Sequence, residues 1–262
     1  MESDVSVDDF PIAGNPAAAP DDPVALLPVA PGIALWWCDL TRSDAQMARL
    51  SAWLSPAERE RAARFGTPAL RRRWMAGRAT LRLLLARTVG VAPGAVALSR
   101  GVRGRPQLAD ASLGVDFNVT HTLSVALVAI ARGLPATVRI GVDIEHEDRG
   151  IGADRLAAKF LTPREHATLD PLGAYARRRR FLRHWTCKEA MSKATGDGLA
   201  APFGRLDVEL DAGPRLIAGP PPYDPAAWTL HVAAVPAGYL ATVAVWRGEP
   251  GPQRTNAAAD SV

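Results

Sequence analysis

The chain contains little cysteine and little lysine. Its 262 residues include two cysteines, Cys38 and Cys187, and three lysines beside 28 arginines. The cysteines form neither a Cys-x-x-Cys pair nor a disulfide framework. This scarcity argues against a structural zinc site and fits a reducing cytoplasm.

Long apolar segments and a targeting sequence are also missing. The longest apolar run, 123–131, has the length of a strand, whereas a membrane-spanning helix needs about 18 apolar residues. The first residues, MESDVSVDD, are acidic and do not resemble a secretory or mitochondrial signal. We therefore expect a cytoplasmic protein without a membrane segment.

Charge is plentiful but unevenly distributed. Residues 1–41 contain seven acidic residues and no lysine or arginine, so the rest of a chain with net charge +4 carries +11. A body with this charge attracts polyanions, which include phosphates, nucleic acids and acidic proteins.

The order of the expected elements indicates an α+β protein with two similar halves. Residues 1–30 and 249–262 are rich in Ala, Pro and other small or polar residues and lack periodicity, so we expect a disordered arm and a disordered tail. In the segments 31–136 and 137–248, helical patterns precede strand patterns. We find no repeat of individual residues, so the pseudo-duplication rests on element order alone. The expected helices are 43–54, 55–65, 69–89, 154–160, 163–169 and 175–194, and the expected strands are 33–40, 95–100, 114–122, 124–132, 137–144, 206–210, 228–235 and 239–247.

One apolar strand ends in a cluster of acids. Because strand side chains alternate between faces, Asp143 and Glu145 point to the same side, about 7 Å apart. With Gly141 beside them, which has no side chain, they could form a pocket for a hard cation. Acids in a turn exposed to solvent are the alternative interpretation.

A predicted helix over 181–195 carries Glu189 and Lys193 one turn apart on one face. A surface ion pair, worth roughly a few tenths of a kcal/mol, is one interpretation. The apolar neighbours on this helix favour a functional role instead. If the helix packs on the acidic strand, Glu189 would join Asp143 as a further carboxylate, and carboxylates with waters and a phosphate are typical of Mg²⁺ sites.

Two other segments could meet phosphate groups, although each could also be purely structural. Thr120 and His121 end a predicted strand, and Gly104, Arg105 and Pro106 lie in a glycine-rich turn. Helical spacing cannot put every arginine on one face, so only part of them can line a positive cleft. The arginines cluster in the segments 59–64, 71–82 and 177–183.

Five motifs, in the same order, resemble those of the 4′-phosphopantetheinyl transferases. IGVDIE (140–145) and WTCKEAMSK (185–193) closely resemble the paired signature of that family. RGRPQL, DFNVTHT and GDGL resemble its Gly-Lys-Pro turn, its Phe-Asn-Ser-His strand and the loop after its Lys-Glu helix. The resemblance covers about residues 33–247 and is to the two-lobed, surfactin-synthetase-activating type. It implies a monomer with a pseudo-duplicated α+β fold, in which each lobe is a small antiparallel sheet with packed helices.

The resemblance also implies a reaction and a site. The 4′-phosphopantetheine group of coenzyme A would pass to a serine of an acyl or peptidyl carrier protein, as in polyketide or nonribosomal peptide biosynthesis, and 3′,5′-ADP would leave. Mg²⁺ would be held by Asp143, Glu145 and Glu189. Catalysis would depend on Glu189, Lys193 and Asp143, with Glu189, Glu165 or a water as the base. The residues implied to bind coenzyme A are Arg73, Gly104, Arg105, Pro106, Thr120, His121 and Lys193.

Other interpretations stay open for the same residues. A basic nucleic-acid-binding protein, or a metal-dependent nuclease that uses the same acids, would bind DNA or RNA in a salt-sensitive way. A degenerate lobe that only binds carriers is disfavoured because the acids and Lys193 are intact. The transferase interpretation predicts a deep phosphate pocket between the lobes, no nucleic-acid or membrane partner, and a carrier-binding face near 177–180.

Overall fold

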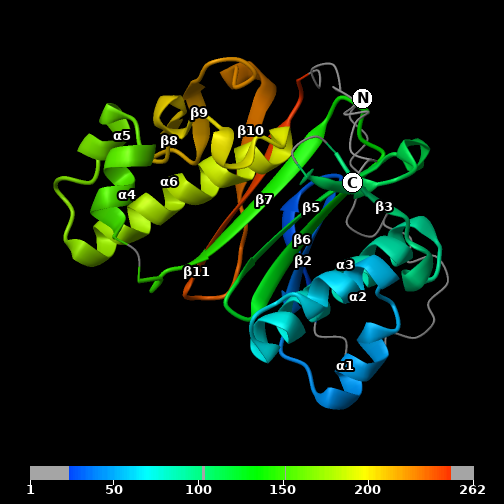
Figure 1. Ribbon diagram of the computed structural model, residues 1–262. Helices are drawn as coiled ribbons and strands as arrows, with labels where there is room; N and C mark the ends of the chain where they lie inside the picture. The colour runs from blue at the N-terminus through cyan, green and yellow to red at the C-terminus, as the bar shows by residue number, and fades with distance from the viewer. Residues whose placement is uncertain (1–23, 102–103, 151, 249–262) are drawn as a thin grey trace, which may run out of the picture.

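Two groups of helices flank two central sheets, and the chain passes from one group to the other at its middle (Figure 1). The computed structural model describes residues 24–101, 104–150 and 152–248. The N-terminal lobe contains β1 (Val24–Ala30), β2 (Ile33–Asp39), α1 (Asp44–Ser51), α2 (Pro56–Ala63), α3 (Pro68–Val89), β3 (Leu98–Arg100), β4 (Pro106–Leu108), β5 (Val115–Thr122) and β6 (Val125–Arg132). The C-terminal lobe contains β7 (Arg139–His146), α4 (Ala153–Phe160), α5 (Pro163–Ala167), α6 (Ala174–Thr195), β8 (Asp207–Glu209), β9 (Arg215–Ala218), β10 (Trp228–Val232) and β11 (Tyr239–Trp246). Among the helices described, none combines the length and the apolarity that crossing a membrane requires.

The N-terminal lobe is built on a four-stranded antiparallel sheet in the order β1-β2-β6-β5. The 22-residue helix α3 packs against it, with Leu81 and Leu85 in the same buried cluster as Phe117 of β5 and Ile130 of β6. Pro68 stands at the first position of this helix and Gly90, with φ of 75°, ends it in the left-handed conformation that glycine adopts easily.

Residues 24–30 form strand β1, so the expectation of a disordered arm over 1–30 is wrong for this part. The strand pairs with β2 between Val24–Cys38 and Ala30–Ile33, with an irregularity after Leu27. Because β1 lies at the sheet edge, it tolerates Pro28, which weakened the strand pattern in the sequence. Residues 1–23 and the predicted tail 249–262 lie outside the described residues.

The C-terminal lobe repeats this topology, which confirms the pseudo-duplicated α+β fold. Its main sheet has the order β10-β11-β7, which matches β5-β6-β2 of the first lobe. In each lobe, two short helices, a 22-residue helix and a small two-stranded sheet follow the first of these matched strands. Strand β9 is an element that the sequence pattern did not predict, because it has four residues and only Leu216 is buried.

The structure reveals a repeat of individual residues that the sequence analysis did not find. Both α2 and α5 begin with a capping box in which proline follows the N-cap, and the third helical residue is a buried glutamate, Glu58 or Glu165. Each glutamate faces the eleventh and fifteenth residues of the long helix of its own lobe. The matched partners are Arg78 and Arg82 for Glu58, and His184 and Lys188 for Glu165.

Helix α6 lies unusually close to β7, and Gly141 makes this approach possible. A Cβ atom at this position would lie 1.9 Å from the carbonyl oxygen of Ala190 and 2.7 Å from the backbone nitrogen of Ala194. Side chains of α6 near residue 190 therefore lie next to the acidic end of β7, as the sequence analysis required.

The two main sheets meet along β5 and β7, where side chains replace the usual backbone ladder. The Asp116 carboxylate accepts from the backbone N–H of Ile140 (2.8 Å), and the Asn118 amide oxygen accepts from that of Val142 (3.1 Å). The paired residue numbers rise together, so the strands run parallel. A buried apolar cluster formed by β2, β6, β7 and β11 continues across both lobes.

Candidate functional site

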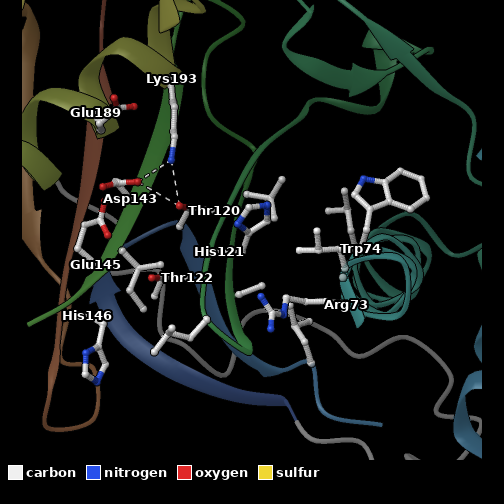
Figure 2. Close-up of a pocket in the computed structure, with 18 of the residues that line it drawn as sticks. Arg73, Trp74, Thr120, His121, Thr122, Asp143, Glu145, His146, Glu189 and Lys193 are labelled. Atoms are coloured by element: carbon white, nitrogen blue, oxygen red, sulfur yellow. Dashed lines mark hydrogen bonds and ion pairs between the residues drawn. The ribbon is translucent and has the colours of Figure 1, made fainter. Parts of the chain in front are cut away.

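A cleft of about 1030 Å³ opens between the two lobes. One wall comes from β7 and α6, the opposite wall comes from α2, α3 and the segments that flank them, and the end of β5 lies between (Figure 2). Of the residues implied by the family resemblance, those that line the cleft are Arg73, Pro106, Thr120, His121, Asp143, Glu145, Glu189 and Lys193.

Asp143 stands at the centre of the acidic wall and is 5% exposed. Its Oδ1 accepts from Lys193 Nζ (2.6 Å) and from Thr120 Oγ1 (3.1 Å), and Lys193 Nζ also donates to Thr120 Oγ1 (2.9 Å). Figure 2 shows these contacts as dashed lines. Asp143 Oδ2 is buried and has no hydrogen-bond partner among the described residues. A buried carboxylate oxygen without a partner fits a ligand that brings its own positive charge.

Glu145 lies two residues further along β7 on the same side, as strand alternation predicts. It accepts from Trp185 Nε1 (3.2 Å) and forms an ion pair with Arg149. Burial and the neighbouring Asp143 raise the pKa of Glu145, although Arg149 and Trp185 act in the opposite direction. The cation of Arg149 thus occupies an oxygen that the family resemblance gives to a metal.

Glu189 reaches the cleft from α6, one turn before Lys193 (Figure 2). Its carboxylate has no hydrogen bond or ion pair among the described residues. Burial, followed by the charge of Asp143, raises the pKa of Glu189 to about 7, while Lys193 acts in the opposite direction. This carboxylate can therefore hold or release a proton near neutral pH.

The acids share a cleft, but they do not form a closed metal cage. Among the described residues, no three His, Cys, Asp or Glu side chains converge closely enough to hold a metal ion. Lys193 on Asp143 and Arg149 on Glu145 neutralise two of the acids instead. The donor set of carboxylates, with one oxygen unpartnered, suits a hard divalent cation such as Mg²⁺.

The opposite wall supplies arginines and aromatic rings. The guanidinium of Arg61 lies 5.8 Å from the centre of the Trp74 ring, and Phe65 packs against the same ring at 5.7 Å. Arg73 and Trp74 project from α3 toward the cleft, across from His121 (Figure 2). Cations and flat apolar surfaces together suit a phosphorylated nucleotide.

The structure does not place Gly104 or the side chain of Arg105 in the cleft wall, although the resemblance implied that both bind coenzyme A. The Arg105 guanidinium turns between the lobes and forms a bidentate ion pair with Asp116. Among the described residues of this turn, Pro106 alone lines the cleft.

Glu165, one of the three candidate bases, is fully buried outside the cleft wall. It accepts from Lys188 Nζ (2.5 Å) and from the backbone N–H of Val208 (2.8 Å). Burial would raise the pKa of Glu165, but His184 and Lys188 outweigh it and lower that pKa. A buried, ion-paired carboxylate has no access to a substrate proton, which leaves Glu189 or a water as candidate bases.

Arg177, Arg178, Arg179 and Arg180 all have carboxylate partners. Arg177 contacts Asp154 and Asp170, Arg178 contacts Asp148, Arg179 contacts Glu147, and Arg180 contacts Asp211. The row is therefore largely neutralised, which weakens the case for a nucleic-acid surface there.

Arg149 and Trp74 are two of the cleft residues that were not singled out from the sequence. Arg149 follows the acidic run and reads as an ordinary turn residue, and Trp74 reads as an apolar residue of a helix. The structure reveals Arg149 through its ion pair with Glu145 and Trp74 through its position on the cleft wall.

Comparisons with known proteins agree across both lobes. Residues 139–244 match the 4′-phosphopantetheinyl transferase superfamily, and residues 40–132 match the family described as 4′-phosphopantetheinyl transferase, N-terminal. The chain is 41% identical over 170 residues to the 4′-phosphopantetheinyl transferase HetI of Nostoc sp., which is 64% of this chain and 70% of that protein. It is 32% identical over 173 residues to the protein slr0495 of Synechocystis sp., an alignment that covers 66% of this chain and 68% of that protein. It is 33% identical over 180 residues to a phosphopantetheinyl transferase of Thraustochytrium sp., an alignment that covers 64% of this chain and 61% of that protein.

Proposed function

Because this chain belongs to the 4′-phosphopantetheinyl transferase superfamily and is a transferase that activates carrier proteins, we propose that its interlobe cleft performs the transfer from coenzyme A. The observation that carries this proposal is the convergence of Asp143, Glu145, Glu189 and Lys193, from β7 and α6, on one cleft. The opposite, arginine-rich wall supports the binding of the nucleotide end.

The metal proposed for this site is Mg²⁺, with Asp143, Glu145 and Glu189 as its protein ligands. Asp143 Oδ2, which lacks a partner, supports this assignment. Bound Mg²⁺ supplies positive charge that offsets the negative charge of the reacting phosphate groups. Arg149 pairs with Oε1 of Glu145 and Lys193 with Oδ1 of Asp143, so Oδ2 of Asp143 is the oxygen that a cation could reach without displacing Lys193.

Lys193 is proposed to exchange the Asp143 carboxylate for a phosphate oxygen of coenzyme A, with Thr120 and His121 as further donors on the same side of the cleft. Arg73, across the cleft, would neutralise phosphate charge at the nucleotide end. Pro106 would line that end through apolar contact.

Glu189 is proposed to accept the proton of the carrier serine, directly or through a water. Without a bound cation its pKa of about 7 lies in the range of a general base, and a bound Mg²⁺ would lower that pKa. The serine oxygen forms a bond to the phosphorus next to the pantetheine arm. The bond from that phosphorus to the leaving oxygen breaks, and 3′,5′-ADP departs with the electron pair.

The partners proposed are coenzyme A and an acyl or peptidyl carrier protein in the cytoplasm, with the enzyme as a monomer. A panel of apo carrier proteins from fatty-acid, polyketide and peptide systems, incubated with coenzyme A and Mg²⁺, tests this proposal. Modified carriers gain about 340 Da, the mass of the transferred group, in intact-mass spectra. No gain on any carrier, with salt-sensitive DNA or RNA binding instead, would replace the transferase with the nucleic-acid alternative.

Substitution of the central acids gives the sharpest test of the site. Asp143→Ala and Glu189→Ala are expected to reduce transfer by about a thousandfold or more while the fold is kept, because both carboxylates serve charge and not core packing. Glu60→Ala is the matched control, since Glu60 is an exposed acid paired with Arg64 on α2. Transfer near the wild-type rate in either cleft variant at ordinary Mg²⁺ would remove this site from consideration.

A further inference from the structure

Arg105 lies outside the cleft, yet its guanidinium touches the two elements that carry the catalytic groups. Its Nε donates to the carbonyl oxygen of Lys193 (3.1 Å), near the end of α6. One of its terminal nitrogens donates to the carbonyl oxygen of Ile140 (2.9 Å), near the start of β7. Asp143 lies three residues beyond Ile140 on this strand. One side chain of the N-terminal lobe thus holds both catalytic elements of the C-terminal lobe.

Asp116 of β5 fixes the orientation of this guanidinium. Its two carboxylate oxygens accept from the two terminal nitrogens of Arg105, both at 2.9 Å, and the side chains are only 11% and 14% exposed. A buried bidentate pair of this kind holds a guanidinium in one plane. Asp116 Oδ2 also accepts from the backbone N–H of Ile140 (2.8 Å), so the pair grips both backbone groups of that residue.

The contact continues along β5 toward the cleft. Asn118 binds the backbone N–H of Val142, and Thr120, the next residue on this side of the strand, binds the Asp143 carboxylate. The anchoring point at Arg105 therefore sets the position of β7 and α6 against the strand that carries Thr120. A lysine cannot replace this geometry, because a single ammonium does not present a planar set of donors.

We propose that the Arg105 side chain, held by Asp116, is a positioning group that places Lys193 and Asp143 for the transfer and does not itself bind coenzyme A. This inference rests on the proposed function of the cleft. It differs from the role that the family resemblance implied, in which Arg105 lines the nucleotide end. A positioning role predicts lower turnover at unchanged nucleotide affinity, whereas a binding role predicts weaker nucleotide affinity at unchanged turnover.

Steady-state kinetics and calorimetry distinguish the roles. Arg105→Lys and Asp116→Asn are expected to lower kcat by about 10- to 100-fold, because small displacements of reacting groups have effects of this size. The KM for coenzyme A, and the calorimetric Kd of 3′,5′-ADP, are expected to stay within about twofold of the wild-type values. Arg139→Ala is the matched control, since Arg139 lies on β7 beside Ile140 but, within the part of the chain that the structure describes, its side chain donates only to carbonyls of its own segment. Its kcat is expected to be unchanged.

Two results would overturn the proposal. A tenfold weaker Kd for 3′,5′-ADP with kcat preserved would mean that Arg105 binds the nucleotide. A lower Tm with kcat and Kd both preserved would mean that the pair only stabilises the fold. All assays are run well below the Tm of each variant. If a substitution at Arg105 prevents folding, Asp116→Asn tests the proposal instead, because asparagine keeps one oxygen that can accept from the Ile140 N–H.

A second readout does not require that any carrier be modified. The chain has only three lysines, Lys159, Lys188 and Lys193, so lysine-selective isotope labelling gives three side-chain signals that can be assigned. In Arg105→Ala the signal of Lys193 is expected to shift, because its contact with Asp143 changes, while that of Lys159 stays in place. An unchanged Lys193 signal would contradict the positioning role. If the wild type modifies no carrier in the panel, the proposed function fails, and this measurement still decides whether Arg105 positions Lys193.

Discussion

At the scale of single residues, Gly141 decides how close the catalytic helix comes to the acidic strand. Gly141→Ala would place a methyl group against the backbone of Ala190 and Ala194, where no flexible side chain can give way. We expect a loss of about 4 kcal/mol or more in the free energy of unfolding, or failure to fold. Urea denaturation of the variant measures this loss. Gly66→Ala, with no atom within 4 Å of its new Cβ, is the control and is expected to be nearly neutral.

The sequence predicted the acids of the cleft but not all of their partners. Asp143, Glu145, Glu189 and Lys193 were found because strand alternation, helical spacing and the family motifs are local patterns. The contact of Arg105 with Lys193 joins residues 88 positions apart. Neither periodicity nor motif similarity encodes such a contact, and the motif placed Arg105 at the nucleotide end, whereas the cleft lining does not include it.

Arg149 provides a prediction about the metal site. Its guanidinium pairs with Oε1 of Glu145, so a divalent cation at this carboxylate meets a positive charge beside it. Arg149→Ala is expected to tighten cation binding by a few-fold, and not more, because the arginine side chain is 51% exposed and screened by solvent. Electron paramagnetic resonance with Mn²⁺ as the probe, in the presence of 3′,5′-ADP, measures the change. Weaker binding in this variant would show that Arg149 helps to hold the site, and Arg155→Ala on α4 is the control.

At the scale of elements, the buried glutamate of each capping box ties a short helix to a long one. For Glu58, burial would raise the pKa, but the bonds from Arg82, the Ser55 N–H and Arg78 outweigh it and leave that pKa below its usual value of 4.5. A carboxylate whose pKa is lower in the folded state stabilises the protein above its unfolded pKa, and this stabilisation is lost as the pH falls through the folded pKa.

Glu58→Gln isolates this effect, because glutamine keeps the cap but lacks the charge. At pH 7 we expect the variant to be less stable by about 3 to 5 kcal/mol, since two arginines lose a buried partner. The difference from the wild type is expected to shrink as the pH falls below about 4.5. Urea denaturation between pH 3 and pH 7 measures both free energies of unfolding. Glu60→Gln, at an exposed position, is the control, and a difference independent of pH would contradict the prediction.

The long elements were predicted closely, and the short edge elements were not. Helix α3 occupies 68–89 where 69–89 was expected, and β5 occupies 115–122 where 114–122 was expected. Helix α3 buries apolar side chains between Ala76 and Ala86, and Val115, Phe117 and Val119 of β5 pack in the same cluster, so both segments show an apolar periodicity. Strands β1 and β9 gave no such signal, because β1 contains Pro28 and both have mostly exposed or half-buried residues.

At the scale of the whole molecule, the two lobes share a core and are expected to unfold together. Apolar residues of β2 and β6 pack in one buried cluster with those of β7 and β11. Scanning calorimetry is therefore expected to show one transition, with calorimetric and van't Hoff enthalpies in a ratio near one. Two resolved transitions would mean that the seam between β5 and β7 contributes little to cooperativity.

The duplicated architecture has unequal halves. Leu83 is the sixteenth residue of α3, and Glu189 is the sixteenth residue of α6, so the first half carries a hydrocarbon side chain where the second carries an acid. The two lobes thus share an order of elements but carry chemically different side chains at matched positions. We therefore expect an elongated, charged substrate to lie across the seam in one sense, with its direction established before any bond is broken.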